Sequence, residues 1–125
     1  MGYRSEVAIK CEGKAFEMFK KAFQDGVSCI LPDKIFKDGD EYILYWDWVK
    51  WYEDYEDVRI VLSVMDELDT LQNYNDDNTG YGYKFLRIGE DNDDVETREN
   101  SWDIELWMIR KINIPDDLEE VKVAY

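Results

Sequence analysis

The sequence predicts an α+β fold: a two-layer sandwich in which an antiparallel sheet carries two helices on one face. Strand and helix patterns follow one another in the order β-α-β-β-α-β-β, an Asp-Gly turn joins two of the strands, and a long alternating stretch follows that turn. This order indicates a ferredoxin-like split β-α-β unit with an extra C-terminal hairpin strand. The length suits a single domain over residues 1–125.

The first half of the chain divides into four elements and one turn. Residues 3–11 alternate between apolar and polar side chains and predict a strand, whereas residues 14–24 place apolar side chains at helical spacing. Residues 27–36 predict a strand at or near a sheet edge, because a proline interrupts them. Residues 37–40 form the Asp-Gly turn, and residues 41–52 form a long strand.

This long strand is the element around which the sheet is expected to form. Strict alternation assigns Tyr42, Leu44, Trp46, Trp48 and Lys50 to one face, and Ile43, Tyr45, Asp47, Val49 and Trp51 to the other. Large apolar and aromatic side chains therefore lie on both faces. Such a strand is either central and covered on both sides, or it presents one face to a partner.

The second half begins with a helix over residues 53–69, whose apolar stripe contains Val58, Val61 and Met65. Acidic residues lie in the last turn of this predicted helix, where the helix dipole favours cations, so they require another explanation. Four segments then follow. They are a polar loop over residues 72–82, a strand over 82–89, an acidic connection over 90–101 with a short pairing at 95–98, and a strand over 102–114 that leads to a terminal turn or helix.

Charge is unevenly distributed along the chain, whose net charge is −15. Residues 1–37 contain 7 Lys and Arg against 5 Asp and Glu, whereas residues 38–125 contain 8 against 25. Direct binding to nucleic acid is not expected, because phosphate contacts require a basic surface. A basic protein, or one that normally binds nucleic acid, is the expected partner.

Residues for catalysis or metal binding are not evident in this sequence. Histidine is absent, and Cys11 and Cys29 lack the spacing of a zinc site or a disulfide scaffold. Residues 75–80 resemble the start of a calcium loop, but the position of the bidentate glutamate is Leu86. We therefore expect a protein without enzymatic activity, metal or cofactor.

Clustered carboxylates and prominent aromatics are the candidate partner-binding residues. Runs of charged residues usually form solvated surface, but these carboxylates are spaced like the phosphates of a nucleic acid. Trp and Tyr residues, in turn, are frequent hot spots of protein interfaces. The expected partner-binding residues are Asp76, Asp77, Glu90, Asp91, Asp93, Asp94 and Glu96, together with Trp48 and Trp51.

Three segments of the sequence carry a family resemblance: GYRSEVAI near the N-terminus, WVKWYEDYED from residue 48, and FLRIGEDNDDVE from residue 85. Together they resemble small acidic proteins that bacteriophages and prophages encode. The resemblance implies a phage setting and brings no catalytic residues. Since small acidic phage proteins include DNA mimics, it favours an inhibitor of bacterial immunity, of the anti-CRISPR or anti-restriction type.

The sequence therefore favours a phage-encoded inhibitor that acts in the host bacterial cytoplasm and blocks a basic nucleic-acid-binding surface of a defence protein. The sequence contains no apolar run of membrane-spanning length, so no membrane partner is expected. A structural phage domain that forms a homodimer is one alternative. A small-ligand or nucleotide-signal binding protein is another, with Trp46 or Trp48 stacking on a base. In this nucleotide-binding alternative, the candidate phosphate-binding residues are Lys50, Lys84, Arg87 and Arg110.

Overall fold

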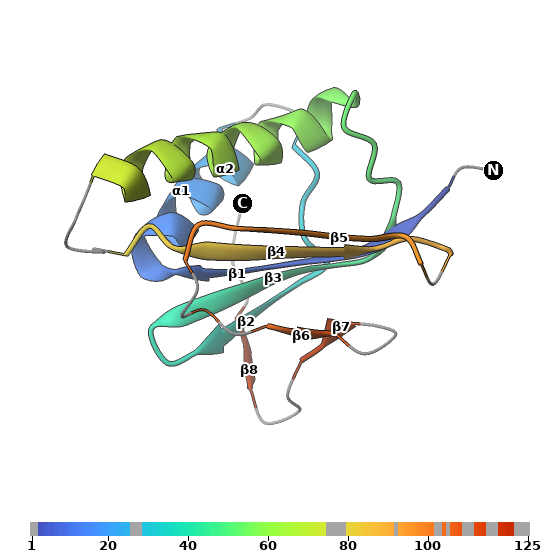
Figure 1. Ribbon diagram of the computed structural model, residues 1–125. Helices are drawn as coiled ribbons and strands as arrows, with labels where there is room; N and C mark the ends of the chain where they lie inside the picture. Colours follow the sequence, from blue (N-terminus) through green and yellow to red (C-terminus); the bar gives the residue numbers. More distant parts are fainter. Residues whose placement is uncertain are drawn as a thin grey trace.

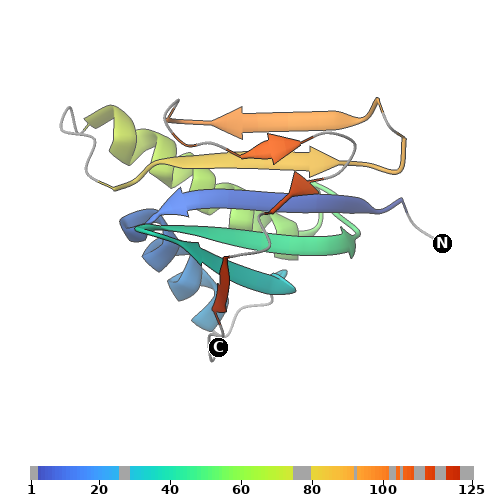
Figure 2. The same cartoon turned by 90° about the horizontal axis from the view of Figure 1, so that it is seen from below.

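A computed structural model describes residues 3–25, 29–74, 80–91, 93–101, 104, 106–108, 112–114 and 118–121. Its main feature is a twisted sheet with both helices on one face (Figure 1). A shorter C-terminal segment crosses the opposite face (Figures 1 and 2). The architecture is α+β with an antiparallel sheet and two helices on one side, as the sequence predicts.

Six strands form the main sheet in the order β5-β4-β1-β3-β2-β8, and every neighbouring pair is antiparallel. Their bounds are β1 Ser5–Glu12, β2 Lys34–Asp38, β3 Glu41–Val49, β4 Tyr83–Ile88, β5 Val95–Glu99 and β8 Glu119–Val121. The central pair, β1 and β3, carries apolar side chains on both faces. The predicted Asp-Gly turn joins β2 to β3, and Gly39 adopts the left-handed φ of 61° that this turn requires.

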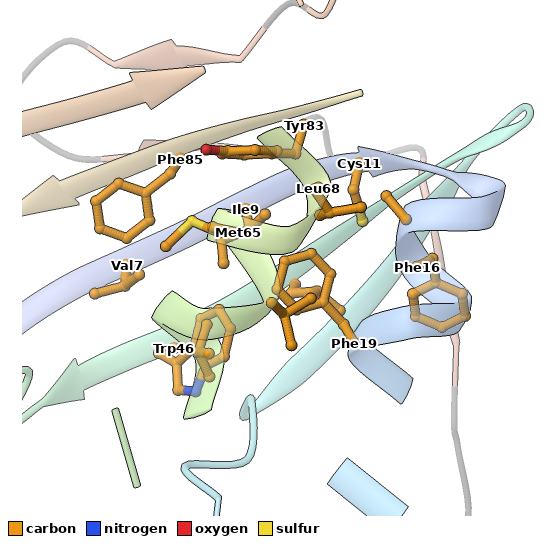
Figure 3. Packing of buried hydrophobic residues seen from close by; sticks show 14 of the residues in the cluster. Val7, Ile9, Cys11, Phe16, Phe19, Trp46, Met65, Leu68, Tyr83 and Phe85 are labelled. Carbon is orange, nitrogen blue, oxygen red and sulfur yellow. The ribbon is translucent and has the colours of Figure 1, made fainter. Parts of the chain in front are cut away.

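Helices α1 (Gly13–Gln24) and α2 (Glu56–Tyr74) cover one face of this sheet. Their apolar stripes face inward because residues three and four apart share one side of a helix. Figure 3 shows Met65 and Leu68 of α2 lying over the strands, with Phe19 of α1 beside them. These three side chains and Trp46 of β3 are fully buried, and burial of each stabilises the fold by about 1.5–3 kcal/mol.

The opposite face of the sheet holds a smaller apolar cluster. Ala8, Ile43 and Leu86 from the three central strands are buried there, together with Leu106 of the C-terminal segment. Strand β3 is therefore central and covered on both sides, which is the first of the two arrangements expected for it. Lys10, which is also largely buried, forms ion pairs with Asp38 and Glu41.

A β-bulge interrupts the alternation of β3. Val7 pairs with Trp46 and Ser5 pairs with Val49, so two residues of β3, Asp47 and Trp48, lie opposite a single residue of β1. Trp48 has a left-handed φ of 62°, which is unfavourable for a side chain with a Cβ. The expectation from strict alternation is therefore wrong beyond Trp46.

This extra residue changes which side chains reach the core. Val49 and Trp51 lie on the helix-covered face with Trp46, although alternation assigns them to the opposite face. The Trp51 ring packs edge-on against Trp46, with ring centroids 5.2 Å apart. The bulge thus leaves Trp48 exposed and buries Trp51.

Several other predicted boundaries differ from the structure. Strand β2 covers Lys34–Asp38 instead of residues 27–36, β3 ends at Val49 instead of residue 52, and α2 ends at Tyr74 instead of residue 69. Helix α2 begins at Glu56 instead of residue 53, because Tyr55 N–H bonds Tyr52 C=O at 3.0 Å and closes a turn before it. The predicted strand over 102–114 is instead a short antiparallel hairpin of β6 (Trp107–Met108) and β7 (Ile112–Asn113). The predicted terminal turn or helix ends as strand β8, which pairs with β2.

Candidate functional site: an acidic end of the sheet

Three segments meet at one end of the molecule, near the N-terminus (Figure 1). They are the start of β1, the connection from β3 to α2, and the turn from β4 to β5. We call this region the acidic end. Its carboxylates come from the two connections and the start of β5: Glu53, Asp54, Glu90, Asp91, Asp93, Asp94 and Glu96.

Tyr3 holds these three segments together. Its backbone N–H donates to the Tyr52 hydroxyl at 2.5 Å, and its own hydroxyl donates to Asp94 Oδ2 at 2.6 Å. The same hydroxyl accepts the Asp91 N–H at 3.1 Å. The Asp91 N–H favours the phenolate, but the bond to Asp94 and partial desolvation outweigh it, so the pKa of Tyr3 is raised.

Arg87 of β4 is the central cation of the acidic end. Its guanidinium bonds both Asp94 oxygens, at 2.8 and 3.2 Å, and its Nε donates to Glu96 at 2.9 Å. It also donates to the buried Ser5 hydroxyl at 3.0 Å. The hydrogen bonds from Arg87, followed by that from Tyr3, hold the pKa of Asp94 below its usual value.

Gly89 lies where the Asp94 and Tyr3 side chains approach the backbone closely. A Cβ at this position would collide with the Asp94 carboxylate and the Tyr3 hydroxyl. Its backbone N–H also bonds Asp94 C=O at 2.8 Å, where the turn leads into β5. The glycine therefore permits the turn to fold back against the start of β1.

A surface hollow of about 440 Å³ lies at the acidic end. Its walls combine aromatic rings with carboxylates, and its single cation is already paired. The lining residues are Tyr3, Trp51, Tyr52, Glu53, Asp54, Arg87, Asp94 and Glu96. Such a lining suits a lysine or arginine side chain from a partner, which can meet both carboxylates and ring faces.

Five exposed carboxylates of the acidic end form no ion pair with the described residues. They are Glu53, Asp54, Glu90, Asp91 and Asp93. A second hollow, of about 680 Å³, shares Glu53 and continues along α2 past Glu56 and Arg59. The unpaired negative charge therefore extends from the β4–β5 turn onto the first turns of α2.

The residues predicted from sequence divide into five groups. Glu90, Asp91 and Asp93 are exposed, whereas Asp94 and Glu96 are paired with Arg87. Trp48 has 46% of its surface exposed and is available to a partner. Trp51 is 6% exposed and packs mainly in the core, because the bulge turns it inward, although it also contributes to the wall of the hollow. Asp76 and Asp77 lie outside the described residues.

Comparisons with protein-family models, curated proteins and solved structures find no match. What the acidic end does must therefore be inferred from its geometry.

Neither α1 nor α2 has the length and apolar character of a helix that crosses a membrane. Among the residues that the structure describes, no group of three or more carboxylates or cysteines is placed to hold a metal ion. Burial raises the pKa of the Cys11 thiol, and burial followed by the Asp57 carboxylate raises that of Cys29 to about 11. Both thiols are therefore protonated at neutral pH and are poor nucleophiles.

Lys50, Lys84 and Arg87, the described residues among those expected to bind phosphate, do not form a basic site. Arg87 is occupied by Asp94 and Glu96, and Lys84 lies in the sheet opposite Lys10 and Glu99. Lys50 is exposed beyond the end of β3, and Arg110 lies outside the described residues. This geometry does not favour a nucleotide-binding pocket.

Sequence reasoning missed Tyr3, Tyr52, Glu53 and Asp54 as parts of this site. Glu53 and Asp54 carry a local signal, since they are adjacent acids after an aromatic pair, but they were assigned to the start of a helix. Nothing in the sequence indicates that Tyr3 contacts the β4–β5 turn, because that proximity depends on the pairing of β1 with β4.

Proposed function

We propose that this protein is a phage-encoded inhibitor that binds a bacterial defence protein and occupies its basic nucleic-acid-binding surface. In this proposal it acts by binding, without catalysis, in the host cytoplasm. Exposed carboxylates take the place of nucleic-acid phosphates, so the mode of action is that of a DNA mimic of the anti-CRISPR or anti-restriction type. Its partner is a protein, and it has no direct contact with nucleic acid or membrane.

The unpaired carboxylates around an aromatic-lined hollow are the observation that carries this proposal. Glu90, Asp91 and Asp93 project from a turn that Tyr3 and Arg87 fix in position. Because the turn is held in place before binding, little conformational entropy is lost on association. The uncompensated charge would accelerate association with a basic surface and make it depend on ionic strength.

The resemblance to small acidic phage proteins supports the biological setting of this proposal. We also infer that β1, α1, β2, β3, α2 and β4 form a ferredoxin-like unit. The strand order β4-β1-β3-β2 within the sheet supports this inference, since it is the arrangement expected of a split β-α-β pair. Strands β5 and β8 are then additions at the two sheet edges.

Capture of partners from a bacterial lysate, followed by direct binding measurements, tests the proposal. We expect the captured protein to be one that binds nucleic acid, and we expect a DNA duplex of about 20 base pairs to compete with the inhibitor. Affinity should fall at least tenfold between about 50 and 200 mM salt, since several charge pairs are involved. Binding that is insensitive to salt and to added DNA would contradict the proposal.

A matched pair of triple variants locates the contact. Glu90→Gln, Asp91→Asn and Asp93→Asn together should weaken binding by at least about tenfold, because each removes one unpaired charge.

The control removes the same charge from exposed positions outside the acidic end, with Asp25→Asn, Asp40→Asn and Glu67→Gln. We expect the control to change affinity by less than about threefold, through the net charge alone. Equal losses in both triple variants would show that net charge, and not the acidic end, determines binding.

A further inference from the structure

We infer that strand β5 is a self-complementary edge through which two copies of this chain pair antiparallel about Thr97. This inference does not depend on the proposed function, because it concerns the outer edge of β5 and not the exposed acids of the β4–β5 turn, although Glu96 belongs to both regions. Figure 2 shows β5 as the outermost strand at one side of the sheet, and no described segment pairs with its outer edge. An unpaired strand edge presents backbone donors and acceptors that another strand can bind.

The hydrogen bonds at both ends of β5 show which backbone groups face outward. Gly89 N–H bonds Asp94 C=O, and Asn100 N–H bonds Tyr83 C=O. Hydrogen-bonded residues alternate along an antiparallel pair, so Glu96 and Arg98 direct their backbone groups toward β4. Val95, Thr97 and Glu99 therefore direct theirs away from the sheet. Only these outward residues can bond the strand of a second copy.

This alternation leaves three central registers, and charge selects one of them. A twofold axis at residue 96 places Glu96 opposite its own copy, and an axis at residue 98 does the same for Arg98. Both registers bring like charges together, which destabilises a strand pair. An axis at Thr97 places Glu96 opposite Arg98 of the second copy and brings the two Thr97 residues together. Opposite charges then meet twice in the same dimer.

The Arg98 and Glu96 side chains each keep an atom that their bonds within one copy do not use. Arg98 uses the single atom Nη2 for its bonds to Asp66 and Asp69, each 2.7 Å long. Glu96 receives Arg87 on Oε1. The Arg98 and Glu96 side chains are 32% and 42% exposed, so Nη1 of the first and Oε2 of the second can reach a neighbouring strand. Val95, with 43% of its surface exposed, would be covered by the second copy.

The dimer is expected to be weak. A five-residue strand edge buries less surface than the 1,200–2,000 Å² of a typical stable interface, which indicates a Kd on the order of 10 μM or weaker. The net charge of −15 on each copy also opposes association at low salt. In such a dimer the two β4–β5 turns would lie about 20 Å apart along the strand direction, so the assembly would carry two acidic ends.

Disulfide trapping tests the register directly. In a Cys29→Ser background at about 0.3 M salt, Thr97→Cys should give a disulfide dimer under mild oxidation, since directly opposed residues lie about 5.5 Å apart. Val95→Cys alone should crosslink at least tenfold more slowly, because the two copies of residue 95 would be about 13 Å apart. Equal crosslinking of both variants, or none with Thr97→Cys, would overturn the proposal.

A second test uses a substitution that removes one outward-facing backbone N–H of β5. Thr97→Pro deletes an N–H that faces away from β4, so the β4–β5 pairing is retained, as is common for proline in edge strands. Sedimentation equilibrium should show self-association weakened by about tenfold, because two symmetric hydrogen bonds are lost. Thr97→Val keeps the N–H and should associate as the wild type does. If Thr97→Pro is folded and associates equally well, the edge is not the interface.

Discussion

The Tyr3 hydroxyl donates a 2.6 Å hydrogen bond to Asp94 Oδ2, joining residues that lie 91 positions apart in the sequence. This bond connects the start of β1 to the turn that carries the exposed acids. Arg87 holds the same carboxylate from β4, so the Asp94 carboxylate receives donors from β4 and from the segment that precedes β1. The order of the acidic end therefore depends on a few residues that are not themselves candidate contacts.

Gly89→Ala should destabilise the fold by roughly 1 kcal/mol, because the Asp94 and Tyr3 side chains must shift and the hydrogen bond between them is lost. The added Cβ would meet both the Asp94 carboxylate and the Tyr3 hydroxyl. Urea unfolding of the variant and the wild type measures the change in the free energy of unfolding. Gly13→Ala is the matched control, because a Cβ at this first position of α1 would lie 3.8 Å from its nearest neighbour, Asp40 O. That substitution should be neutral or slightly stabilising, since alanine favours the helix.

The low pKa of Asp94 predicts a pH-dependent effect of Asp94→Asn. A carboxylate whose pKa is lower in the folded state stabilises the fold above the unfolded value of about 3.9, and this contribution is lost as the pH falls through the folded value. At pH 7 the substitution should cost about 1 kcal/mol, at the low end for a charged hydrogen bond because the side chain is 35% exposed.

Unfolding curves measured at pH 7, 5, 4 and 3 test this prediction. The difference between the wild type and Asp94→Asn should remain constant down to about pH 5 and then shrink toward zero in acid. Asp93→Asn serves as the control, since Asp93 is exposed and lacks an ion pair among the described residues. A difference for Asp94→Asn that stays constant down to pH 2 would contradict the assignment.

Trp48 combines a left-handed backbone with an exposed ring, which suggests that it is retained for contact with a partner. Trp48→Gly should be more stable than Trp48→Ala by about 1 kcal/mol, because glycine adopts a φ of 62° without strain. The same substitution should weaken partner capture by removing an exposed aromatic side chain. Trp48→Ala removes the ring and keeps the strain, so it should weaken capture without the gain in stability.

Local patterns of this sequence predicted much of the fold, because turn chemistry and side-chain periodicity act over short distances. The Asp38-Gly39 turn and the buried stripe of α1 follow from such patterns, and both are confirmed. The alternation of Ile43 and Leu44 is likewise confirmed, since they pack in different clusters on the two faces of the sheet.

The predictions from sequence are wrong where contacts between distant segments decide the structure. An extra residue at the β3 bulge does not alter the hydrophobic pattern, so alternation alone provides no reason to separate Trp48 from Trp46. The candidate site was predicted only in part, because it too depends on contacts between distant segments. Runs of acids locate the exposed turn, but only the pairing of β1 with β4 brings Tyr3 and Arg87 to Asp94.

The structure explains why acidic residues occur where the sequence predicts the last turn of α2. Asp66 and Asp69 seemed misplaced in a last helical turn, but α2 continues to Tyr74, and both acids bind Arg98 of β5. Asp69 also accepts the Tyr83 hydroxyl at 2.9 Å. The acids therefore connect the helix layer to the sheet and are not opposed by the helix terminus.

A double-mutant cycle on Arg98 and Asp69 tests this connection. Arg98→Met and Asp69→Asn should each destabilise the fold by roughly 1–2 kcal/mol, since each removes a charged partner at a partly exposed position. The double variant should cost less than the two single costs added together, with a coupling of about 0.5–1 kcal/mol, because both changes remove the same bond. Denaturant unfolding of the four proteins gives this value, and strictly additive costs would show that the 2.7 Å contact contributes nothing to stability.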